Sequence, residues 1–334
     1  MTDTDSATTT TMRAIVQDRY GSSETLRLVR VSPPRLAEHE VLVKVRAAGL
    51  DRGTWHLMTG QPYLMRVLGF GFRAPKNRVP GLDVAGTVVA VGAAVTTFST
   101  GDHVFGISRG SFAEYAAVRE DKLSRKPCNL TFDEAAAVPV SAGTALQALT
   151  DAGRIAPGQR VLVVGASGGV GGYAVQLAKA LDAEVTGVCS TAKLDFVRSL
   201  GADHVLDYTR QDFAAGTDTY DLIVDIGGNT SLHRLRSSLT ATGTLVIVGG
   251  EEGGRWTGGF GRSLRAPLLS LFVRQRLTML ASKERASDQE RLTTFIEAGM
   301  VKPSIDRTYP LDRVPEAMRH LEAGAVRGKV VITI

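Results

Sequence analysis

The stretch that decides the fold is Arg160-Val-Leu-Val-Val-Gly-Ala-Ser-Gly-Gly-Val-Gly-Gly-Tyr-Ala-Val-Gln-Leu-Ala-Lys179, in which an apolar strand leads through a glycine cluster into an amphipathic helix. Ala166, Gly168 and Gly171 occupy the three small-residue positions of the G-x-G-x-x-G fingerprint, with alanine at the first. These positions allow a tight turn, close approach of a pyrophosphate, and close packing of helix on strand. We therefore predict a dinucleotide site that includes the residues of this turn: Ala166, Ser167, Gly168, Gly169 and Val170.

The surroundings of this turn favour a bound ligand. A glycine-rich turn also occurs where nothing binds, because glycine adopts conformations that other residues avoid. Here a second strand, Glu184–Cys189, follows the helix, so the segment forms one right-handed βαβ unit. The N–H groups at the start of the helix would then face the phosphates, where the helix dipole favours negative charge.

The pattern continues as alternating strands and helices, which predicts an α/β fold with a doubly wound parallel sheet. Strands are predicted at 160–165, 184–189, 203–206, 221–225 and 243–248, with a sixth, edge strand at 277–281. Helices are predicted at 169–181, 192–200 and 230–240.

The first part of the chain is predicted to be rich in strands. Apolar or alternating runs at 14–16, 26–29, 40–47, 84–91 and 101–105 predict a small barrel-like β domain. Residues 131–152 are predicted to be helical, opening with the capping box Thr131-Phe-Asp-Glu134. The tail contributes predicted helices at 288–298 and 312–322 and strands near 305 and at 329–334. Because this tail is too short for its own domain, we expect it to return and complete the first.

Length and composition indicate a globular protein of two domains. The chain has 334 residues, 43% hydrophobic and 22% charged, which is the balance of a soluble globular protein. The formal charge of +5 is spread among acidic residues and gives little support for nucleic-acid binding, although a pI near 9.3 suits an anionic cofactor. The two cysteines, Cys128 and Cys189, have no metal-binding spacing and fit a reducing compartment.

The N-terminal residues 1–11 are predicted to form a disordered tail, because they are rich in Ser, Thr and Asp and lack the apolar core of a signal peptide. The longest candidate for a membrane span, 266–273, is far too short for a bilayer. We therefore expect a cytoplasmic protein with neither a membrane nor a nucleic-acid partner.

Several motifs, in the same order, resemble those of the medium-chain dehydrogenase/reductase superfamily. They are Met12-Arg-Ala-Ile, residues 79–92, Gly101-Asp-His-Val-Phe-Gly106, Gly110-Ser-Phe-Ala-Glu-Tyr115, the fingerprint at 166–171, Ser199-Leu-Gly-Ala-Asp203 and Gly328-Lys-Val-Val-Ile332. The chain is most similar to the zinc-independent quinone oxidoreductase branch, which includes zeta-crystallin-like proteins and related enone reductases. The resemblance implies a GroES-like β-barrel catalytic domain at 12–131, completed by 287–334, and a Rossmann NADP-binding domain at 132–286.

The same resemblance predicts that no metal is bound. Zinc-containing relatives place a Cys, a His and a further Cys or acidic residue around a metal that polarises the alcohol oxygen. The corresponding places hold Asp51, Leu82 and, approximately, Val140. Leucine and valine cannot bind a metal, and the four-cysteine structural lobe of those relatives is missing.

The tip of the second strand favours NADPH as the cofactor. NAD-preferring sites usually place Asp or Glu there, whereas this chain has Cys189-Ser-Thr-Ala-Lys193. Ser190 and Thr191 offer hydroxyl donors and Lys193 a positive charge to a 2′-phosphate. By resemblance, Tyr208 lies beside that phosphate. Alternatively, Ser190 and Thr191 cap the next helix and Lys193 is solvated on its first turn.

Two further strand ends are predicted to contact the cofactor, because ligands bind at the carboxyl edge of open α/β sheets. They are Asp225-Ile-Gly-Gly228 and Val246-Ile-Val-Gly-Gly250, and the predicted contacts are Ile226, Gly227, Val248, Gly249 and Gly250. Both segments are equally compatible with simple strand-ending turns. By resemblance Thr144 lies beside the nicotinamide; alternatively its hydroxyl bonds to its own helix.

Hydride transfer without a metal requires an acceptor that is already electron-poor, such as a quinone or an α,β-unsaturated carbonyl. The candidate catalytic residues are Asp51 and Tyr63. Most relatives have Asn at the position of Asp51, and a carboxylate donates a hydrogen bond only when protonated. Tyr63 resembles a tyrosine that contacts nicotinamide or substrate in relatives, although surface packing explains it equally well. Arg52 and His56 match no family role, so we expect them to be solvated or structural.

Two apolar inserts, 64–72 and 251–276, are predicted either to line a pocket for a small apolar electrophile or to lie in a subunit interface. Relatives commonly dimerise by pairing an edge strand, so we expect a homodimer through 277–281. The predicted function is reduction of a quinone, or of the C=C bond of an enone, by NADPH. Two alternatives stay open: an enoyl reductase dedicated to one biosynthetic intermediate, and an NADPH-binding protein with little turnover.

Overall fold

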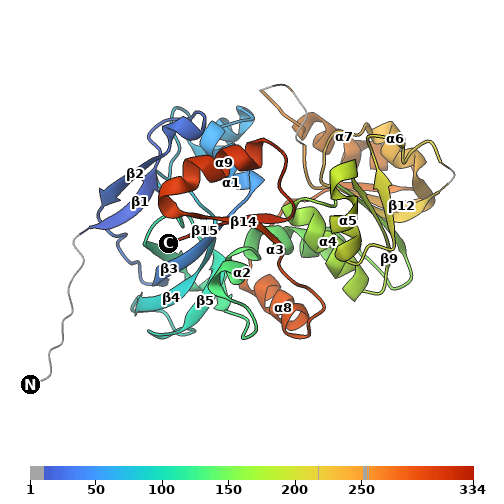
Figure 1. The fold of residues 1–334 in the computed structure, drawn as a ribbon. Helices are drawn as coiled ribbons and strands as arrows, with labels where there is room; N and C mark the ends of the chain where they lie inside the picture. The colour runs from blue at the N-terminus through green and yellow to red at the C-terminus, as the bar shows by residue number, and fades with distance from the viewer. Residues whose placement is uncertain (1–10, 217, 251–253, 255) are drawn as a thin grey trace, which may run out of the picture.

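The structure, a computed structural model, describes residues 11–216, 218–250, 254 and 256–334. It consists of two lobes, with the N-terminal lobe on the left of Figure 1 and the second lobe on the right. The predicted disordered tail lies outside the described residues except for Thr11, and so do residues 251–253 and 255 of the second insert.

The second lobe is built on a six-stranded parallel sheet. Its strands lie in the spatial order β10, β9, β8, β11, β12, β13, and every pairing is parallel. Counted along the chain, this is the 3-2-1-4-5-6 order of doubly wound dinucleotide-binding folds. The strands are β8 (Arg160–Val164), β9 (Glu184–Cys189), β10 (His204–Asp207), β11 (Tyr220–Asp225), β12 (Leu239–Ile247) and β13 (Arg276–Met279). The predicted fold class is confirmed, and β13 forms the predicted sixth strand at the sheet's edge.

Both faces of this sheet are buried, because alternate residues of each strand point to opposite sides. In β8, Val161 packs in the same core as Leu177 of α4, whereas Leu162 packs in the same core as Leu235 of α6. The helices of this lobe are α4 (Gly169–Ala180), α5 (Leu194–Ser199), α6 (Leu232–Ser237) and α7 (Phe260–Ser270). No helix in the described part of the chain combines the length and the apolar character that crossing a bilayer requires.

The predicted helix at 230–240 is wrong at its end, because α6 stops at Ser237. Leu239 already belongs to β12, where it lies opposite Tyr220 of β11. The Tyr220 N–H also donates to the Ser238 carbonyl at 2.8 Å. Pairing with a distant strand therefore decides where this helix ends.

The first lobe contains a seven-stranded sheet to which the end of the chain contributes. β15 (Lys329–Thr333) pairs antiparallel with β3 (Glu40–Leu50) and parallel with β14 (Ile305–Pro310), so the red tail in Figure 1 enters the blue lobe. The other strands of this lobe are β1 (Met12–Val16), β2 (Arg27–Val31), β4 (Asp83–Val91), β5 (His103–Ile107), β6 (Tyr115–Arg119) and β7 (Leu123–Arg125). Two helices, α1 (Arg52–Thr59) and α9 (Val314–Glu322), pack on the core of this lobe.

The predicted helix over 131–152 is divided in the structure. Its capping box is present, since Thr131 Oγ1 accepts from the Glu134 N–H at 3.2 Å and Glu134 Oε2 accepts from the Thr131 N–H at 2.9 Å. The first helix, α2 (Phe132–Ala136), stops before a second, α3 (Pro139–Gln147), and a wider helical turn follows at Ala148–Ala152. Proline has no N–H to continue a helix but fits its first turn, so a single helix here is wrong.

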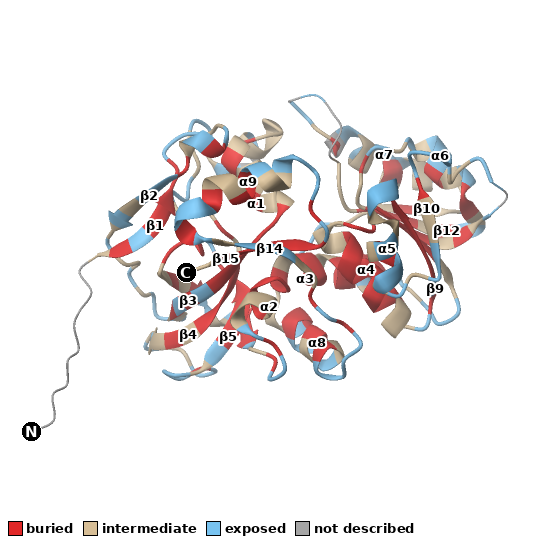
Figure 2. Cartoon of the chain, viewed as in Figure 1, coloured by how far each residue is buried: buried red, intermediate tan, exposed pale blue. Residues whose placement is uncertain are grey.

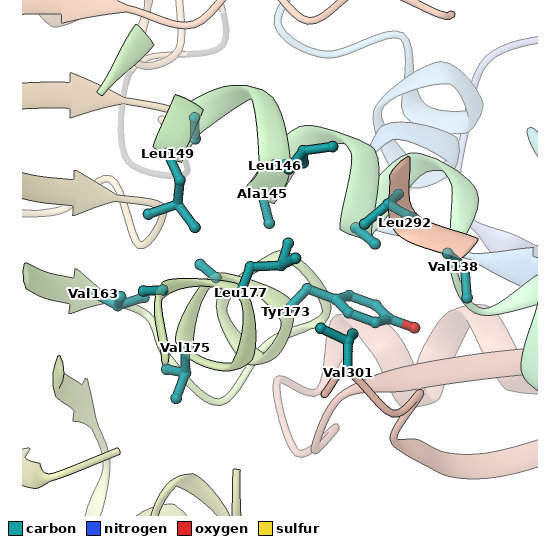
Figure 3. Packing of buried hydrophobic residues seen from close by; sticks show 14 of the residues in the cluster. Val138, Ala145, Leu146, Leu149, Val163, Tyr173, Val175, Leu177, Leu292 and Val301 are labelled. Carbon is teal, nitrogen blue, oxygen red and sulfur yellow. The ribbon is translucent and has the colours of Figure 1, made fainter. Parts of the chain in front are cut away.

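Helices α3 and α4 pack against each other at the junction of the two lobes. Leu146 of α3, Leu149 of the turn that follows it and Leu177 of α4 lie in one core, and both helices are buried along most of their length (Figures 2 and 3). The Tyr173 hydroxyl of α4 donates to the Ala137 carbonyl at 3.1 Å. Helix α8 (Ala286–Glu297) adds Leu292 to this core. This packing fixes the N-terminus of α4 beside α3.

Candidate active site

A cavity of about 550 Å³ lies where the two lobes meet. Its wall combines α1, α3, the N-terminus of α4, the ends of β11 and β12, and the returning tail. The predicted site residues that line it are Asp51, Thr144, Gly168, Gly169, Val170, Lys193, Ile226, Val248, Gly249 and Gly250. The predicted site residues that do not line it are Tyr63, Ala166, Ser167, Ser190, Thr191, Tyr208 and Gly227.

The N-terminus of α4 presents backbone N–H groups to the cavity. Gly168 is its N-cap residue and supplies no capping side chain, and the first turn holds no acidic residue. The first N–H groups of such a helix form an anion site. A Cβ on Gly169 would lie 3.0 Å from Lys329 Cδ, so glycine keeps this wall of the cavity open. These features fit the pyrophosphate of a dinucleotide.

The rest of the fingerprint positions this turn rather than lining the cavity. A Cβ on Gly171 would lie 2.1 Å from the Gly165 carbonyl oxygen, so only glycine lets α4 pack this closely on the end of β8. Ala166 is fully buried, and the Ser167 carbonyl accepts from the Gly328 N–H at 3.0 Å. This last bond ties the returning tail to the predicted phosphate-binding turn.

Glycine is also required at the end of β12. A Cβ on Gly249 would lie 2.1 Å from the Ile226 carbonyl oxygen, and one on Gly250 would lie 2.6 Å from Gly259 Cα. Both glycines line the cavity, whereas the Gly227 N–H turns back to the Val164 carbonyl at 3.1 Å. Because these glycines have no side chains, the cavity wall at the carboxyl edge of the sheet is bare backbone, against which a flat ring can lie.

A buried ion pair behind this wall was missed by the sequence analysis. Asp225, fully buried at the end of β11, lies 2.5 Å from Arg262 Nη1 of α7. Arg262 also donates to the carbonyls of Thr230 at 2.7 Å and of Gly249 at 3.0 Å. Burial raises the pKa of the Asp225 carboxyl above its usual value, and Arg262 opposes that rise. The signal in the sequence was an acidic residue directly after the apolar run Leu222-Ile-Val224.

The segment predicted to bind the 2′-phosphate is held by several contacts. Lys193 lines the cavity, and its ammonium donates to the carbonyls of Gly324 at 2.7 Å and Val326 at 2.9 Å in the tail. Burial lowers the pKa of Lys193. The Thr191 hydroxyl donates to the Asp207 carboxylate. Lys193 is therefore not simply solvated, as one alternative had it.

Ser190 and Tyr208 lie near this segment but make no contact with the cavity. Ser190 is the N-cap residue of the short helical turn Thr191–Lys193, without a side-chain cap bond. Tyr208 is 62% exposed, and its backbone N–H donates to the Cys189 carbonyl at 3.1 Å. Both side chains lie beyond the cavity, where only the outer end of a dinucleotide would reach.

The candidate acid of the site, Asp51, belongs to a buried cluster of charges. Its Oδ1 caps α1 by accepting from the Thr54 N–H at 2.8 Å, whereas its Oδ2 is buried without a hydrogen-bond partner among the described residues. Lys329 Nζ lies 4.0 Å from this Oδ2 and 2.8 Å from Asp83 Oδ2. Asp83 Oδ1 accepts from the Val140 N–H at 2.7 Å.

Burial raises the pKa of Asp83 to about 6, and the nearby Asp51 adds to that rise, whereas Lys329 lowers it. Sequence analysis missed both Asp83 and Lys329 as members of the site. Lysine at the start of the apolar strand 329–334 was the available signal.

The second catalytic candidate, Tyr63, packs between the two inserts. Its ring lies edge-on to Trp256 with centroids 5.5 Å apart, and the Arg66 guanidinium lies 4.5 Å from its centre. The Leu64 N–H donates to the Trp256 carbonyl at 3.0 Å. The inserts therefore meet, and residues from both line the cavity, Met65 from the first and Ser263 from the second. A role for Tyr63 at the reacting atoms stays a prediction.

The cavity wall also includes two polar residues of α1. Arg52 and His56 both line the cavity, and His56 Nδ1 lies 2.8 Å from the Gln61 carbonyl oxygen. Across the described ranges, no three His, Cys, Asp or Glu side chains are grouped so that they could hold a metal ion.

Two family models match the chain. The model for the alcohol dehydrogenase GroES-like domain matches residues 37–128, and the model for a zinc-binding dehydrogenase matches residues 200–332. The first match falls in the lobe that contains α1, and the second includes most of the parallel sheet and the returning tail.

Known proteins are similar along nearly the whole chain. The NADPH-dependent alkenal/one oxidoreductase of Arabidopsis thaliana chloroplasts is 34% identical over 96% of this chain and 79% of its own length. The chloroplast envelope quinone oxidoreductase homolog of the same plant is 32% identical, over 96% of this chain and 98% of its own. The solved quinone oxidoreductase of Coxiella burnetii is 27% identical, with a TM-score of 0.84 over 97% of this chain and 99% of that one.

Proposed function

The chain belongs to the medium-chain dehydrogenase/reductase superfamily, in its quinone oxidoreductase-like branch, and is an NAD(P)H-dependent oxidoreductase; from this premise we propose that it uses NADPH, without zinc, to reduce a quinone or the C=C bond of an α,β-unsaturated carbonyl. The observation that supports this most directly is the composition of the cavity wall. The N-terminus of α4, the glycine-lined strand ends, Asp51 and Lys329 share one cavity wall, and Leu82 and Val140 stand where zinc-containing relatives have metal ligands.

NADPH, when bound, supplies a hydride from C4 of its nicotinamide ring. The N-terminus of α4 would hold the pyrophosphate through the N–H groups around Gly169 and Val170. Gly249 and Gly250 let a ring approach the backbone at the sheet edge, and Thr144 lines the same cavity. These residues orient the donor and exclude water from it, which is the main contribution of a protein to hydride transfer.

The proposed preference for NADPH rests on the outer end of the cavity. Lys193 offers positive charge there, and Arg327, whose guanidinium donates to the Ala192 carbonyl at 2.9 Å, lies close by. Ser190 adds a hydroxyl group and Tyr208 an exposed phenol, and the Thr191 hydroxyl, which donates to Asp207 here, would have to turn to reach a phosphate. Positive charge and hydroxyl donors favour a 2′-phosphate over a ribose hydroxyl.

The acceptor that suits this cavity is small, apolar and already electron-poor. Met65 of the first insert, Pro62 just before it and Leu280 near the edge strand give the wall an apolar character. Hydride addition to a quinone or an enone places negative charge on a conjugated oxygen, so the carbon that accepts hydride needs no Lewis acid. Asp51 is the proposed polar residue nearest to this step.

We also propose a homodimer that forms through β13. This strand pairs with β12 on one side, and no described strand pairs with its other side. An exposed strand edge is a ready site for pairing with a second copy. Light scattering at two protein concentrations tests this: a monomeric mass at both would contradict it.

The function is tested by following NADPH and NADH oxidation with a panel of quinones and enones, before and after dialysis against a chelator. We expect turnover with electron-poor acceptors, a preference for NADPH, and no loss after chelation. Loss of activity that added zinc restores would contradict the zinc-free proposal. Tight NADPH binding with turnover of no acceptor would instead favour a binding protein.

A further inference from the structure

Three charged side chains, Lys329, Asp83 and Asp51, lie buried together at the wall of the cavity. An ion pair between Lys329 and Asp83 accounts for the burial of two of them but not for that of Asp51. Lys329 is 2% exposed and Asp83 is fully buried, and their side chains meet at 2.8 Å. This pair joins the first residue of β15 to the first of β4 and would be complete without another charge. Asp51, 9% exposed, nevertheless lies beside it and leaves one carboxylate oxygen unpaired.

The unpaired oxygen has a physical cost. A buried carboxylate oxygen that accepts no hydrogen bond forfeits its hydration, and such a loss is tolerated mainly at functional sites. Asp51 Oδ2 lies 4.0 Å from Lys329 Nζ, close enough for attraction but too far for a hydrogen bond. Both residues line the cavity, so a ligand atom or a water molecule can reach the space beside them.

The proposed reaction needs a proton at this place. Hydride addition leaves an oxyanion on the acceptor, and the neutral product requires one proton on that oxygen. A proton donor works best when its pKa is close to that of the group it protonates. The Lys329 ammonium lies at the cavity wall and carries protons that it can donate to such an oxyanion.

We propose that the Lys329 ammonium donates the proton to the acceptor oxyanion and that Asp51 returns a proton from solvent to Lys329. The inference rests on the proposed function. In the step, an N–H bond of Lys329 breaks and an O–H bond forms on the acceptor, while the electron pair of the hydride stays on the acceptor. The neutral amine then takes a proton from a water molecule that bridges it to Asp51 Oδ2 across their 4.0 Å separation, Asp51 passes on the solvent proton that restores this water, and Asp83 holds the ammonium in place. An enol formed in this way returns to the carbonyl form in water.

Other titratable groups surround the cluster and define the controls. Arg52 and His56 of α1 line the same cavity, and Tyr173 of α4 lies behind Asp83. Burial raises the pKa of Tyr173 well above its usual value, and the Asp83 carboxylate adds to that rise. The hydroxyl of Tyr173 already donates to a backbone carbonyl, so it does not compete as the donor.

The first test is Lys329→Arg, which keeps the positive charge beside Asp83 but holds its proton too tightly to donate it. We expect folding and NADPH affinity to stay close to those of the unmodified protein, whereas kcat falls by about 100-fold, the scale of losing a general acid. The fall of kcat at alkaline pH that reports Lys329 should disappear. Lys179→Arg is the matched control, because Lys179 pairs with Asp203 at 2.8 Å away from the cavity and should change nothing.

The second test measures the Lys329 amine directly, without turnover. Carbon-13 labelling of lysine gives an NMR signal for each side-chain εCH₂ group, and the Lys329 signal is the one that Lys329→Arg removes. In the protein loaded with NADP⁺, we expect this signal to titrate at the pH where kcat falls.

The outcomes separate the two proposals. An active protein whose Lys329→Arg variant keeps kcat and the alkaline fall, or whose Lys329 signal titrates elsewhere, would overturn the inference and leave the function intact. Failure of the unmodified protein to reduce any quinone or enone would refute the function itself. Because Lys329→Arg must fold for this comparison, the variant Lys329→Met/Asp83→Asn is a second check. Both charges of the 2.8 Å pair are removed together, the new amide oxygen still accepts from the Val140 N–H, and the same loss of kcat is expected.

Discussion

Arg262 Nη1 lies 2.5 Å from the fully buried Oδ2 of Asp225, and through this contact a helix of the second insert is tied to the end of a central strand. The same guanidinium donates to the Gly249 carbonyl at the cavity wall. The position of α7, and with it Ser263 in the cavity lining, therefore depends on one buried ion pair.

Replacement of Arg262 by methionine should leave the Asp225 charge buried without a partner. We expect the free energy of unfolding to fall by about 3–5 kcal/mol, the usual cost of breaking a buried pair from one side. The double variant Arg262→Met/Asp225→Asn should recover most of this loss, because no charge is then buried. Urea denaturation measures both, and equal stability of the single and double variants would contradict the expectation.

Gly171→Ala should weaken both folding and cofactor binding. Its Cβ would lie 2.1 Å from the Gly165 carbonyl oxygen and 2.8 Å from Ala166 Cα, so α4 must move away from the sheet. Gly172→Ala, one residue along, is the matched control, because its Cβ would lie 3.3 Å from the end of the flexible Leu200 side chain and 4.0 Å from the Ala166 carbonyl oxygen, an ordinary contact. We expect Gly171→Ala to lose about tenfold or more in NADPH affinity. Fluorescence titration that shows the same affinity for both variants would argue against the fingerprint assignment.

The raised pKa of Asp83 should make the free energy of unfolding depend on pH. Burial raises its folded-state pKa to about 6 from an ordinary value of 3.8. The folded protein therefore keeps this proton where the unfolded chain has lost it, so the stabilisation is fully present below about pH 4 and is lost as pH rises through about 6.

The variant Lys329→Met/Asp83→Asn lacks this titration and tests the point. The difference in thermal midpoint between the variant and the unmodified protein should shift in favour of the variant as pH rises from about 4 to about 7. Parallel pH profiles for the two proteins would show that Asp83 titrates normally.

Lys193→Met should discriminate between the two nicotinamide cofactors. Loss of the ammonium removes a charged partner of the 2′-phosphate, and we expect NADPH affinity to fall by about tenfold, or ~1.4 kcal/mol, with little effect on NADH. The bonds to Gly324 and Val326 are lost as well, so any general loosening of the tail should weaken both cofactors equally. Equal losses would therefore refute the 2′-phosphate assignment. Lys179→Met serves as a control for the loss of one positive charge.

The fold of the second lobe could be predicted well, because the sequence features that indicate its strands and helices are local. The apolar run of β8, the glycines that follow it and the amphipathic α4 lie within one continuous stretch of chain. Alternation of such units predicts a parallel sheet, and the structure differs at element ends and in the additional helix α7, which was not predicted. The differences at element ends arise where distant residues intervene, as when Tyr220 pairs with Leu239 and shortens α6.

The charged groups of the site could not be predicted in the same way. Lys329 and Asp83 are separated by most of the chain, as are Asp51 and Lys329, and no spacing rule relates them. Arg262 lies in an insert whose partner strand ends far upstream. Tyr63 was singled out by resemblance, yet the structure packs its ring against Trp256 and away from the cavity lining.

The sequence by itself determined the unit of strand, glycine turn and helix at β8 and α4 and the succession of parallel strands in that sheet, because backbone geometry and hydrophobic periodicity act between near neighbours in the chain. Only the tertiary structure decided which charges share the cavity wall. Long-range strand pairing returns β15 to β3 and thereby places Lys329 beside Asp51 and Asp83. The energy of a buried charge depends on the partners that such pairing supplies.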